Sequence, residues 1–103
     1  MEIVWTNEAK QDLFNFINNA RIDTEKTATE YILKLVDHVE NLSTNSKLGK
    51  SAFLINNTEI RQLIYKSHKI LYFIQENSIY IISVIHSKRD IEMYKKYLQN
   101  NLK

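Results

Sequence analysis

The chain has 103 residues, of which 44% are hydrophobic and 25% charged, a composition that suits one small folded domain and excludes a disordered chain. It contains no cysteine, which excludes disulfide bonds and thiolate metal sites. The formal net charge is +2, and it is unevenly distributed along the chain. Residues 1–58 carry six Lys and Arg against eight Asp and Glu, whereas residues 59–103 carry eight Lys and Arg against four Asp and Glu. This asymmetry favours an anionic partner for the second half.

The N-terminal segment predicts a short strand followed by a helix. Side chains alternate in character from Glu2 to Thr6, as in a half-buried strand. Asn7 is then a candidate helix cap, and the negative charge of Glu8 in the first turn complements the helix dipole. The apolar residues that follow recur at helical spacing: Ala9, Leu13, Phe16 and Ile17.

A second, longer helix is predicted from a cap at Asp23 or Thr24 to about Leu42. Its apolar residues also recur at steps of three and four: Ala28, Tyr31, Ile32, Leu35, Val39 and Leu42. The short connection from Asn18 to Ile22 makes the two helices a hairpin, whose apolar stripe requires a partner surface.

The second half of the chain predicts an antiparallel meander. A polar loop, Ser43 to Lys50, comes first and holds the only glycine, Gly49. Three strand-like runs rich in Ile, Tyr and Phe follow it: Glu59 to Tyr65, Lys69 to Gln75 and Ile79 to His86. Short polar turns join these runs, and Asn77 in the second turn is able to take a left-handed conformation.

Two segments complete the predicted fold. Ser51 to Thr58 is expected to be a loop, because Asn56-Asn57-Thr58 interrupts the short apolar run Phe53-Leu54-Ile55. Helical spacing returns from Asp90 to Leu98. The fold class is therefore α+β, with the order β-α-α-β-β-β, a helical hairpin packed on an antiparallel sheet and a short C-terminal helix, in one domain over residues 1–103.

No segment predicts export, a membrane anchor or a cofactor. The N-terminus lacks the basic start and apolar core of a signal peptide, and the longest apolar run, Ile70 to Ile74, is too short to span a bilayer. His38, His68 and His86 show no metal-ligand spacing. We therefore expect a cytoplasmic protein without a metal ion or cofactor.

Four segments carry a resemblance to a known family. They are the loop Ser46 to Lys50 ending in LGK, EIRQLIY from Glu59, HKILYFI from His68, and SVIHSKRD from Ser83. In this order they resemble the P-x-x-G-R/K loop, the R-x-L strand, the Y-R-I-x-Y strand and the V-x-H-x-x-R-D ending of the RelE/ParE superfamily, the toxins of type II toxin–antitoxin systems. Together with the predicted first strand, which holds Trp5, and the helical hairpin, the resemblance covers nearly the whole chain.

The departures from these motifs bear on the kind of toxin. Ser46 stands where proline is usual, His68 replaces an aromatic residue and Lys69 replaces an arginine. Lysine lacks the planar guanidinium with which arginine forms two parallel hydrogen bonds, so its contact with a phosphate is less directional. Lys69 and the H-x-x-R-D ending make the chain more similar to ParE-like, plasmid-stabilisation toxins than to RelE-like nucleases.

The resemblance implies a toxin that inhibits growth by binding and poisoning DNA gyrase, and that forms a hetero-oligomer with a cognate antitoxin. The alternative is a RelE-like endoribonuclease that cuts mRNA on the ribosome. A third interpretation is a relic or adaptor with the toxin fold and no toxicity. Of the three, only the endoribonuclease needs a catalytic site.

Candidate site residues follow from both toxin interpretations. Metal-free RNA cleavage requires an acid or base and cations around the phosphate, for which His86, Arg61 and Arg89 are the candidates. Binding of the target or of nucleic acid is assigned to a set of basic and aromatic side chains: Arg61, Lys69, Lys88, Arg89 and Tyr94. Each also has a structural explanation, since strand arginines are usually solvated and a strand-end histidine is commonly hydrogen-bonded.

Overall fold

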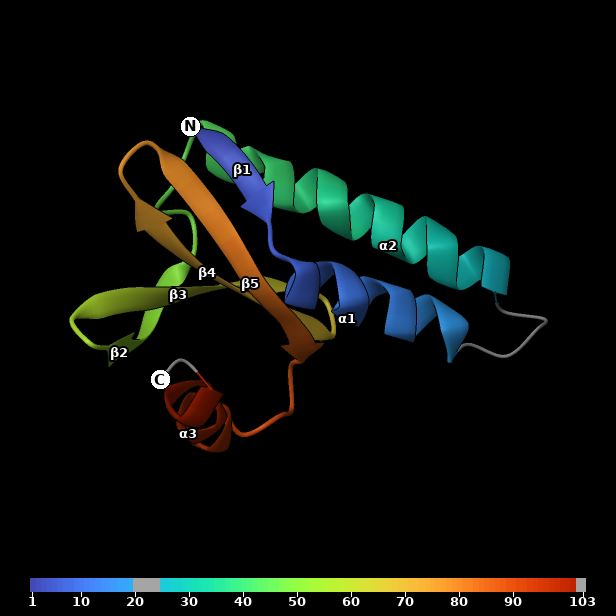
Figure 1. The fold of residues 1–103 in the computed structure, drawn as a ribbon. Helices are drawn as coiled ribbons and strands as arrows, with labels where there is room; N and C mark the ends of the chain where they lie inside the picture. The colour runs from blue at the N-terminus through green and yellow to red at the C-terminus, as the bar shows by residue number, and fades with distance from the viewer. Residues whose placement is uncertain (20–24, 102–103) are drawn as a thin grey trace.

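A computed structural model describes residues 1–19 and 25–101 of the chain (Figure 1). In this part of the chain the α-helices and strands are β1 (Glu2–Trp5), α1 (Asn7–Asn18), α2 (Glu25–Glu40), β2 (Lys50–Ile55), β3 (Thr58–Tyr65), β4 (His68–Gln75), β5 (Ser78–His86) and α3 (Ile91–Asn101), and a 3-10 turn, Asn41–Ser43, continues α2 past Leu42. The α+β class, the helical hairpin on a sheet and the C-terminal helix are confirmed. The predicted cap at Asp23 or Thr24 lies outside the described residues.

The strands form one sheet in the order β1-β5-β4-β3-β2. The meander of β3, β4 and β5 is antiparallel, as predicted. The edge strand β1 differs, because it pairs parallel to β5, with Glu2 opposite Ser78 and Trp5 opposite Ile81. The sheet as a whole is therefore mixed, and β5 continues past Ile81 beyond the end of its β1 partner.

The prediction of a loop over Ser51 to Thr58 was wrong, because most of this segment is strand β2. Asn56 and Asn57 both have positive φ, 49° and 68°. Positive φ at two consecutive residues is the type I′ pattern, the turn that joins two antiparallel strands. The polar residues that looked like the end of an apolar run are thus the turn of a β2–β3 hairpin.

Two local assignments also differ from prediction. The cap of α1 is Thr6 and not Asn7: Thr6 Oγ1 accepts from the Ala9 amide at 3.3 Å and donates to the Ile81 carbonyl at 2.8 Å, which ties the helix start to β5. In the β4–β5 turn the left-handed residue is Glu76, with φ 55°, and not Asn77.

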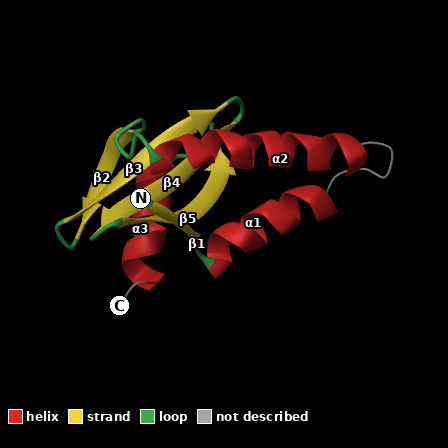
Figure 2. Ribbon diagram, turned by 90° about the horizontal axis from the view of Figure 1, so that it is seen from above, coloured by secondary structure: helices red, strands yellow, loops and turns green. Residues whose placement is uncertain are grey.

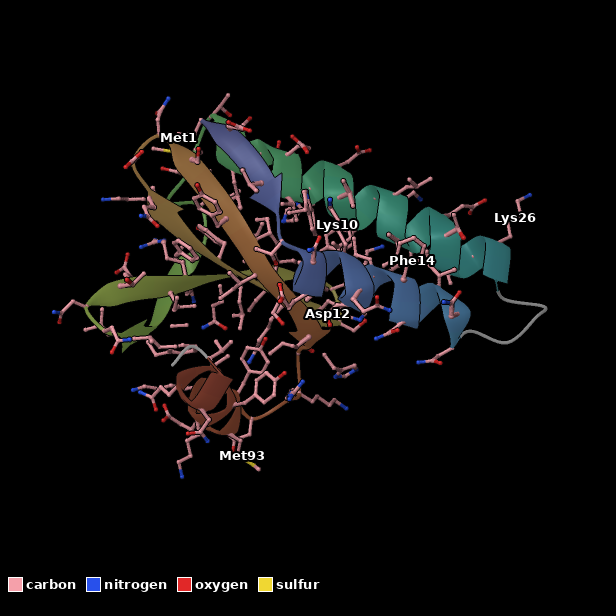
Figure 3. The ribbon with its side chains drawn as sticks, in the orientation of Figure 1. Met1, Lys10, Asp12, Phe14, Lys26 and Met93 are labelled. Atoms are coloured by element: carbon pink, nitrogen blue, oxygen red, sulfur yellow. The ribbon has the colours of Figure 1, made fainter. Side chains whose placement is uncertain are left out.

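The sheet is covered on two faces (Figures 1 and 2). On the hairpin face, α1 and α2 cover a core made of Ala9, Leu35, Val39, Leu42, Leu63, Ile70, Tyr72, Ile79, Ile81 and Val84. On the opposite side, the α3 face, the core consists of Phe53, Ile55, Ile60, Leu71, Ile85, Tyr94 and Leu98. Met93 lies on the outer side of α3, away from the sheet (Figure 3). None of the helices that the structure describes is long and apolar enough to cross a membrane.

Candidate functional site

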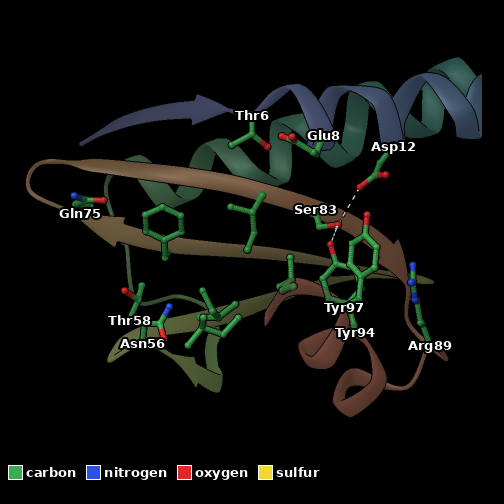
Figure 4. Close-up of a pocket in the computed structure, with 15 residues that line it drawn as sticks. Thr6, Glu8, Asp12, Asn56, Thr58, Gln75, Ser83, Arg89, Tyr94 and Tyr97 are labelled. Carbon is green, nitrogen blue, oxygen red and sulfur yellow. Dashed lines mark hydrogen bonds between the residues drawn. The ribbon is translucent and has the colours of Figure 1, made fainter. Parts of the chain in front are cut away.

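An open groove of about 770 Å³ lies between α3, the sheet and the start of α1 (Figure 4). Its apolar part comes from the α3 face: Ile55, Ile60, Phe73, Ile82 and Leu98. Polar side chains surround it: Thr6, Glu8, Asp12, Asn56, Thr58, Gln75, Ser83, Arg89, Tyr94 and Tyr97. An apolar floor with few, well-placed polar groups is the usual composition of a binding site.

A chain of hydrogen bonds joins three elements at one end of this groove. The Tyr94 hydroxyl on α3 donates to Ser83 Oγ on β5, and Ser83 Oγ donates to Asp12 Oδ2 on α1 at 3.1 Å (Figure 4). Asp12 Oδ2 also accepts from the Val84 amide at 2.9 Å. Burial raises the pKa of the Tyr94 phenol, so it remains a donor at neutral pH.

Asp12 occupies this place because of the shape of β5. The register between β4 and β5 shifts at Leu71 and Tyr72, so that Ile82 is an extra residue, a bulge. Past Ile81 no β1 residue pairs with β5, and the Val84 amide would lack a partner without Asp12. Sequence reasoning missed Asp12, although a carboxylate three residues after Ala9 and four before Phe16, within the apolar stripe of α1, is a signal.

Arg89 and Tyr94 lie together at the groove. The Arg89 guanidinium stands over the Tyr94 ring, 4.8 Å from its centroid, while the rest of Arg89 is exposed. Lys88 is the next residue and is also exposed. The structure therefore brings Arg89 and Tyr94, two of the predicted binding residues, together beside the Asp12–Ser83–Tyr94 hydrogen bonds.

Arg61 is engaged within the protein. Its guanidinium donates to Glu59 Oε1 at 2.8 Å, to the carbonyls of Lys47 and Gly49, and to the Tyr72 hydroxyl at 3.4 Å. The hydrogen bond with Arg61 holds the pKa of Glu59 below its usual value. Arg61 thus holds the loop from Ser46 to Lys50 against the sheet.

Tyr72 completes this loop anchor. Its buried hydroxyl donates to the Ser46 carbonyl at 2.9 Å and accepts from the Gly49 amide at 3.1 Å. A Cβ added at Gly49 would lie 2.5 Å from the Gln62 carbonyl oxygen and 2.8 Å from the Tyr72 hydroxyl. Space, and not a left-handed backbone, is what requires glycine here.

The structure brings Arg89 beside His86, whose carbonyl accepts from the Arg89 amide at 3.0 Å, but it does not bring Arg61 to them. Arg61 pairs with Tyr72 on the hairpin face, and His86 is on the same face but two strands away and four residues further along the strands. Standard strand geometry separates them by about 13 Å along the strands and about 10 Å across them. Lys69, which pairs with Ile64 and Ile85, points to the α3 face, opposite Arg61.

The family model for the ParE toxin of type II toxin–antitoxin systems, parDE, matches residues 3–91. The chain belongs to the ParE toxin family. The match covers β1 to β5 and ends at the first residue of α3. Tyr94 of this ParE-family toxin therefore lies beyond the matched segment, whereas Asp12, Arg61 and Arg89 lie within it.

A solved structure supports the same fold. The chromosomal ParDE toxin–antitoxin system from P. aeruginosa superposes on this toxin with a TM-score of 0.72 at 16% sequence identity, over 85% of this chain and 97% of that one. No curated protein sequence matches the toxin. At this identity the superposition establishes the fold alone.

A histidine pair lies where α1 and α2 meet the sheet of the ParE-family toxin, with His68 buried and His86 exposed. The His68 ring lies 5.9 Å from His86 and 5.0 Å from Phe16 between centroids, and His68 Nδ1 is hydrogen-bonded to the Tyr31 hydroxyl at 2.9 Å. A small cavity of about 190 Å³ adjoins the pair. Across the described residues, no three His, Cys, Asp or Glu side chains are arranged to hold a metal ion.

This pair predicts a pH-dependent stability. Burial and then the charge of His86 lower the pKa of His68 below the usual imidazole value of 6.5. Protonation of His68 is therefore less favourable in the folded toxin than in the unfolded chain. Well above pH 6.5, His68 is neutral in both states and does not affect the free energy of unfolding. As the pH falls from about 6.5 to the folded pKa, His68 lowers this free energy. In urea unfolding between pH 7.5 and 5.5, we expect His68→Phe to lose less stability than the wild type. Parallel profiles for the two proteins would contradict this assignment.

Proposed function

We propose that this ParE-family toxin inhibits growth by binding DNA gyrase, without catalysis, and that a cognate antitoxin neutralises it in a hetero-oligomer. The observation that carries the proposal is the arrangement of the basic side chains. Arg89 and Tyr94 line an open groove of about 770 Å³, with Lys88 next to Arg89 along the chain. Arg61, one of the three candidate nuclease residues, lies apart from the other two.

The groove and the bridge beside it suit recognition of a protein. The Asp12–Ser83–Tyr94 hydrogen bonds fix α3 against β5 and so fix the position of the groove wall. A preorganised apolar groove with an exposed arginine at its mouth has the composition of a protein-binding hot spot, in which Tyr and Arg are enriched. Arg89 is the residue that we expect the gyrase surface to contact.

The alternative, a RelE-like ribosome-dependent endoribonuclease, requires one site that supplies an acid or base and phosphate-binding cations. His86 Nδ1 accepts a hydrogen bond from the Lys88 amide at 3.2 Å, and this contact orients its ring. Arg61 is hydrogen-bonded to Glu59 and to the Ser46–Lys50 loop and does not face His86. The nuclease interpretation therefore keeps His86 with Arg89 beside it, but it lacks Arg61, the cation that we assigned from the sheet.

Expression of the toxin in growing bacteria separates the three interpretations. We expect growth arrest with altered DNA supercoiling and intact mRNA, and inhibition of purified gyrase by the purified toxin. Cleaved transcripts with normal supercoiling would support the endoribonuclease instead. A stably folded protein without any effect on growth would support the relic.

A variant of Arg89 tests the binding surface. We expect Arg89→Ala to weaken inhibition of purified gyrase by at least about tenfold, the effect of removing a hot-spot arginine. Arg89→Lys keeps the charge and loses the planar guanidinium, so its inhibition of gyrase should be intermediate between that of the wild type and that of Arg89→Ala. Lys10→Ala removes an exposed charge from α1 and is the matched control. Full gyrase inhibition by Arg89→Ala would exclude this residue from the interface.

A further inference from the structure

The helix α3 leaves part of the α3 face uncovered. Lys50 pairs with Gln62 across β2 and β3, and Ile64 pairs with Lys69 across β3 and β4. All four side chains share the α3 face, because paired residues and residues two apart along a strand point the same way. The α3 contacts end before Ile64, whose exposed fraction is 53%.

Three lysines border this uncovered area. Ile91, Tyr94 and Leu98 of α3 pack on the sheet, and Tyr97 lines the groove on one flank of the helix. Helical geometry puts Lys95 on the opposite flank. Lys50, Lys69 and Lys95, together with Gln62 and Ile64 between them, are named the lysine strip.

The charges of the lysine strip are not neutralised within the toxin. In the part of the chain that the structure describes, the ion pair within 4 Å is Arg61–Glu59, on the other face. Glu92 is the nearest carboxylate along α3, three residues before Lys95, and among the described residues it forms no ion pair within 4 Å with this lysine. The strip therefore has an uncompensated positive potential.

Gln62 adds a second, independent feature. Its side-chain oxygen is buried and has no hydrogen-bond partner. Buried amide oxygens are normally paired, and each exception requires an explanation. A backbone N–H from a partner, met by rotation of the Gln62 amide, would supply the missing donor.

We propose that the lysine strip binds an acidic polypeptide segment that carries an aliphatic side chain, and that this segment belongs to the antitoxin; the proposal rests on the function proposed above. Carboxylates of the segment meet the three lysines, its aliphatic side chain covers Ile64, and a peptide N–H donates to Gln62. A nucleic-acid backbone would use the lysines but would leave Ile64 uncovered. A protein partner therefore fits the strip better than a polyphosphate does.

Charge reversal tests the lysine strip. Lys50→Glu/Lys69→Glu in the full chain should weaken binding of the protein encoded by the adjoining antitoxin gene by about 30-fold, or about 2 kcal/mol, in isothermal titration. Ile64→Thr should weaken it by about tenfold. The control is Lys10→Glu/Lys34→Glu, an equal change of charge on exposed positions of α1 and α2, which should stay within about threefold. Circular dichroism confirms the fold of each variant, and Lys95→Glu replaces the double variant if that one does not fold.

The outcomes separate the strip from the proposed function. Equal antitoxin binding by the wild type and the charge-reversed variant overturns the proposal for the strip. Equal weakening by the control also overturns it, because the effect would then be a general one of net charge. Loss of single-stranded DNA binding with unchanged antitoxin binding overturns it in favour of nucleic acid. A wild-type toxin that binds no antitoxin overturns the proposed function itself.

Discussion

Gly49→Ala is expected to destabilise the toxin by about 3 kcal/mol, at the upper end of the cost of overpacking. The new methyl group would lie 2.5 Å from the Gln62 carbonyl oxygen, which belongs to the backbone of a central strand and cannot move freely. It would also lie 2.8 Å from the Tyr72 hydroxyl, the group that holds Ser46 and Gly49 in place. The melting temperature should fall by ~12–24 °C.

The matched control for this substitution is Lys47→Ala. Lys47 belongs to the same loop and its side chain is exposed, so its loss should change stability by no more than about 0.5 kcal/mol. Thermal unfolding followed by circular dichroism measures both variants. If Gly49→Ala unfolds at the wild-type temperature, the loop is not held against the sheet in the way described.

Asp12→Ala is expected to cost about 3 kcal/mol, because it removes a charged acceptor and leaves a backbone donor of β5 without a partner. The Val84 amide loses its hydrogen bond, and Ser83 Oγ loses the group to which it donates. Since Ser83 is also the acceptor for Tyr94, α3 loses part of its attachment. We therefore expect weaker gyrase inhibition in addition to lower stability.

Two comparisons make the Asp12 result specific. Asp12→Asn keeps an oxygen acceptor and should lose less than half as much stability as Asp12→Ala. Asp37→Ala removes an exposed carboxylate of α2 and should change the free energy of unfolding little. Hydrogen exchange at the Val84 amide reports the contact itself. An unchanged exchange rate for this amide in Asp12→Ala would show that the carboxylate does not protect it.

The helices and the meander could be predicted because their signals are local. Apolar residues at steps of three and four define α1, α2 and α3, and runs of Ile, Tyr and Phe define β3, β4 and β5. Strand β2 was missed because Asn56-Asn57 has the polarity of a loop, and only its positive φ angles identify a hairpin turn. The parallel pairing of β1 with β5 depends on tertiary contacts, which no local pattern contains.

The site residues were harder to predict, because their roles depend on which face each strand presents. Arg61 and Lys69 both occupy the basic position of a strand motif, yet the register puts their side chains on opposite faces of the sheet. Arg89 and Tyr94 are adjacent because a turn and a helix start bring them together, which helical spacing after Asp90 could indicate. Asp12 has a role only because the bulge at Ile82 presents Ser83 and Val84 to it.

The Arg61–Tyr72–Gly49 anchor has a consequence for how such toxins change during evolution. A gene that lost its toxicity would still need these residues for a folded product, because they hold a loop to the sheet. The exposed side chains of Lys88 and Arg89 do not fix a loop to the sheet, so they could be substituted without loss of the fold. Among descendants of this toxin, we expect the glycine and arginine of the loop anchor to outlast toxicity, and the Lys88-Arg89 pair to be lost with it.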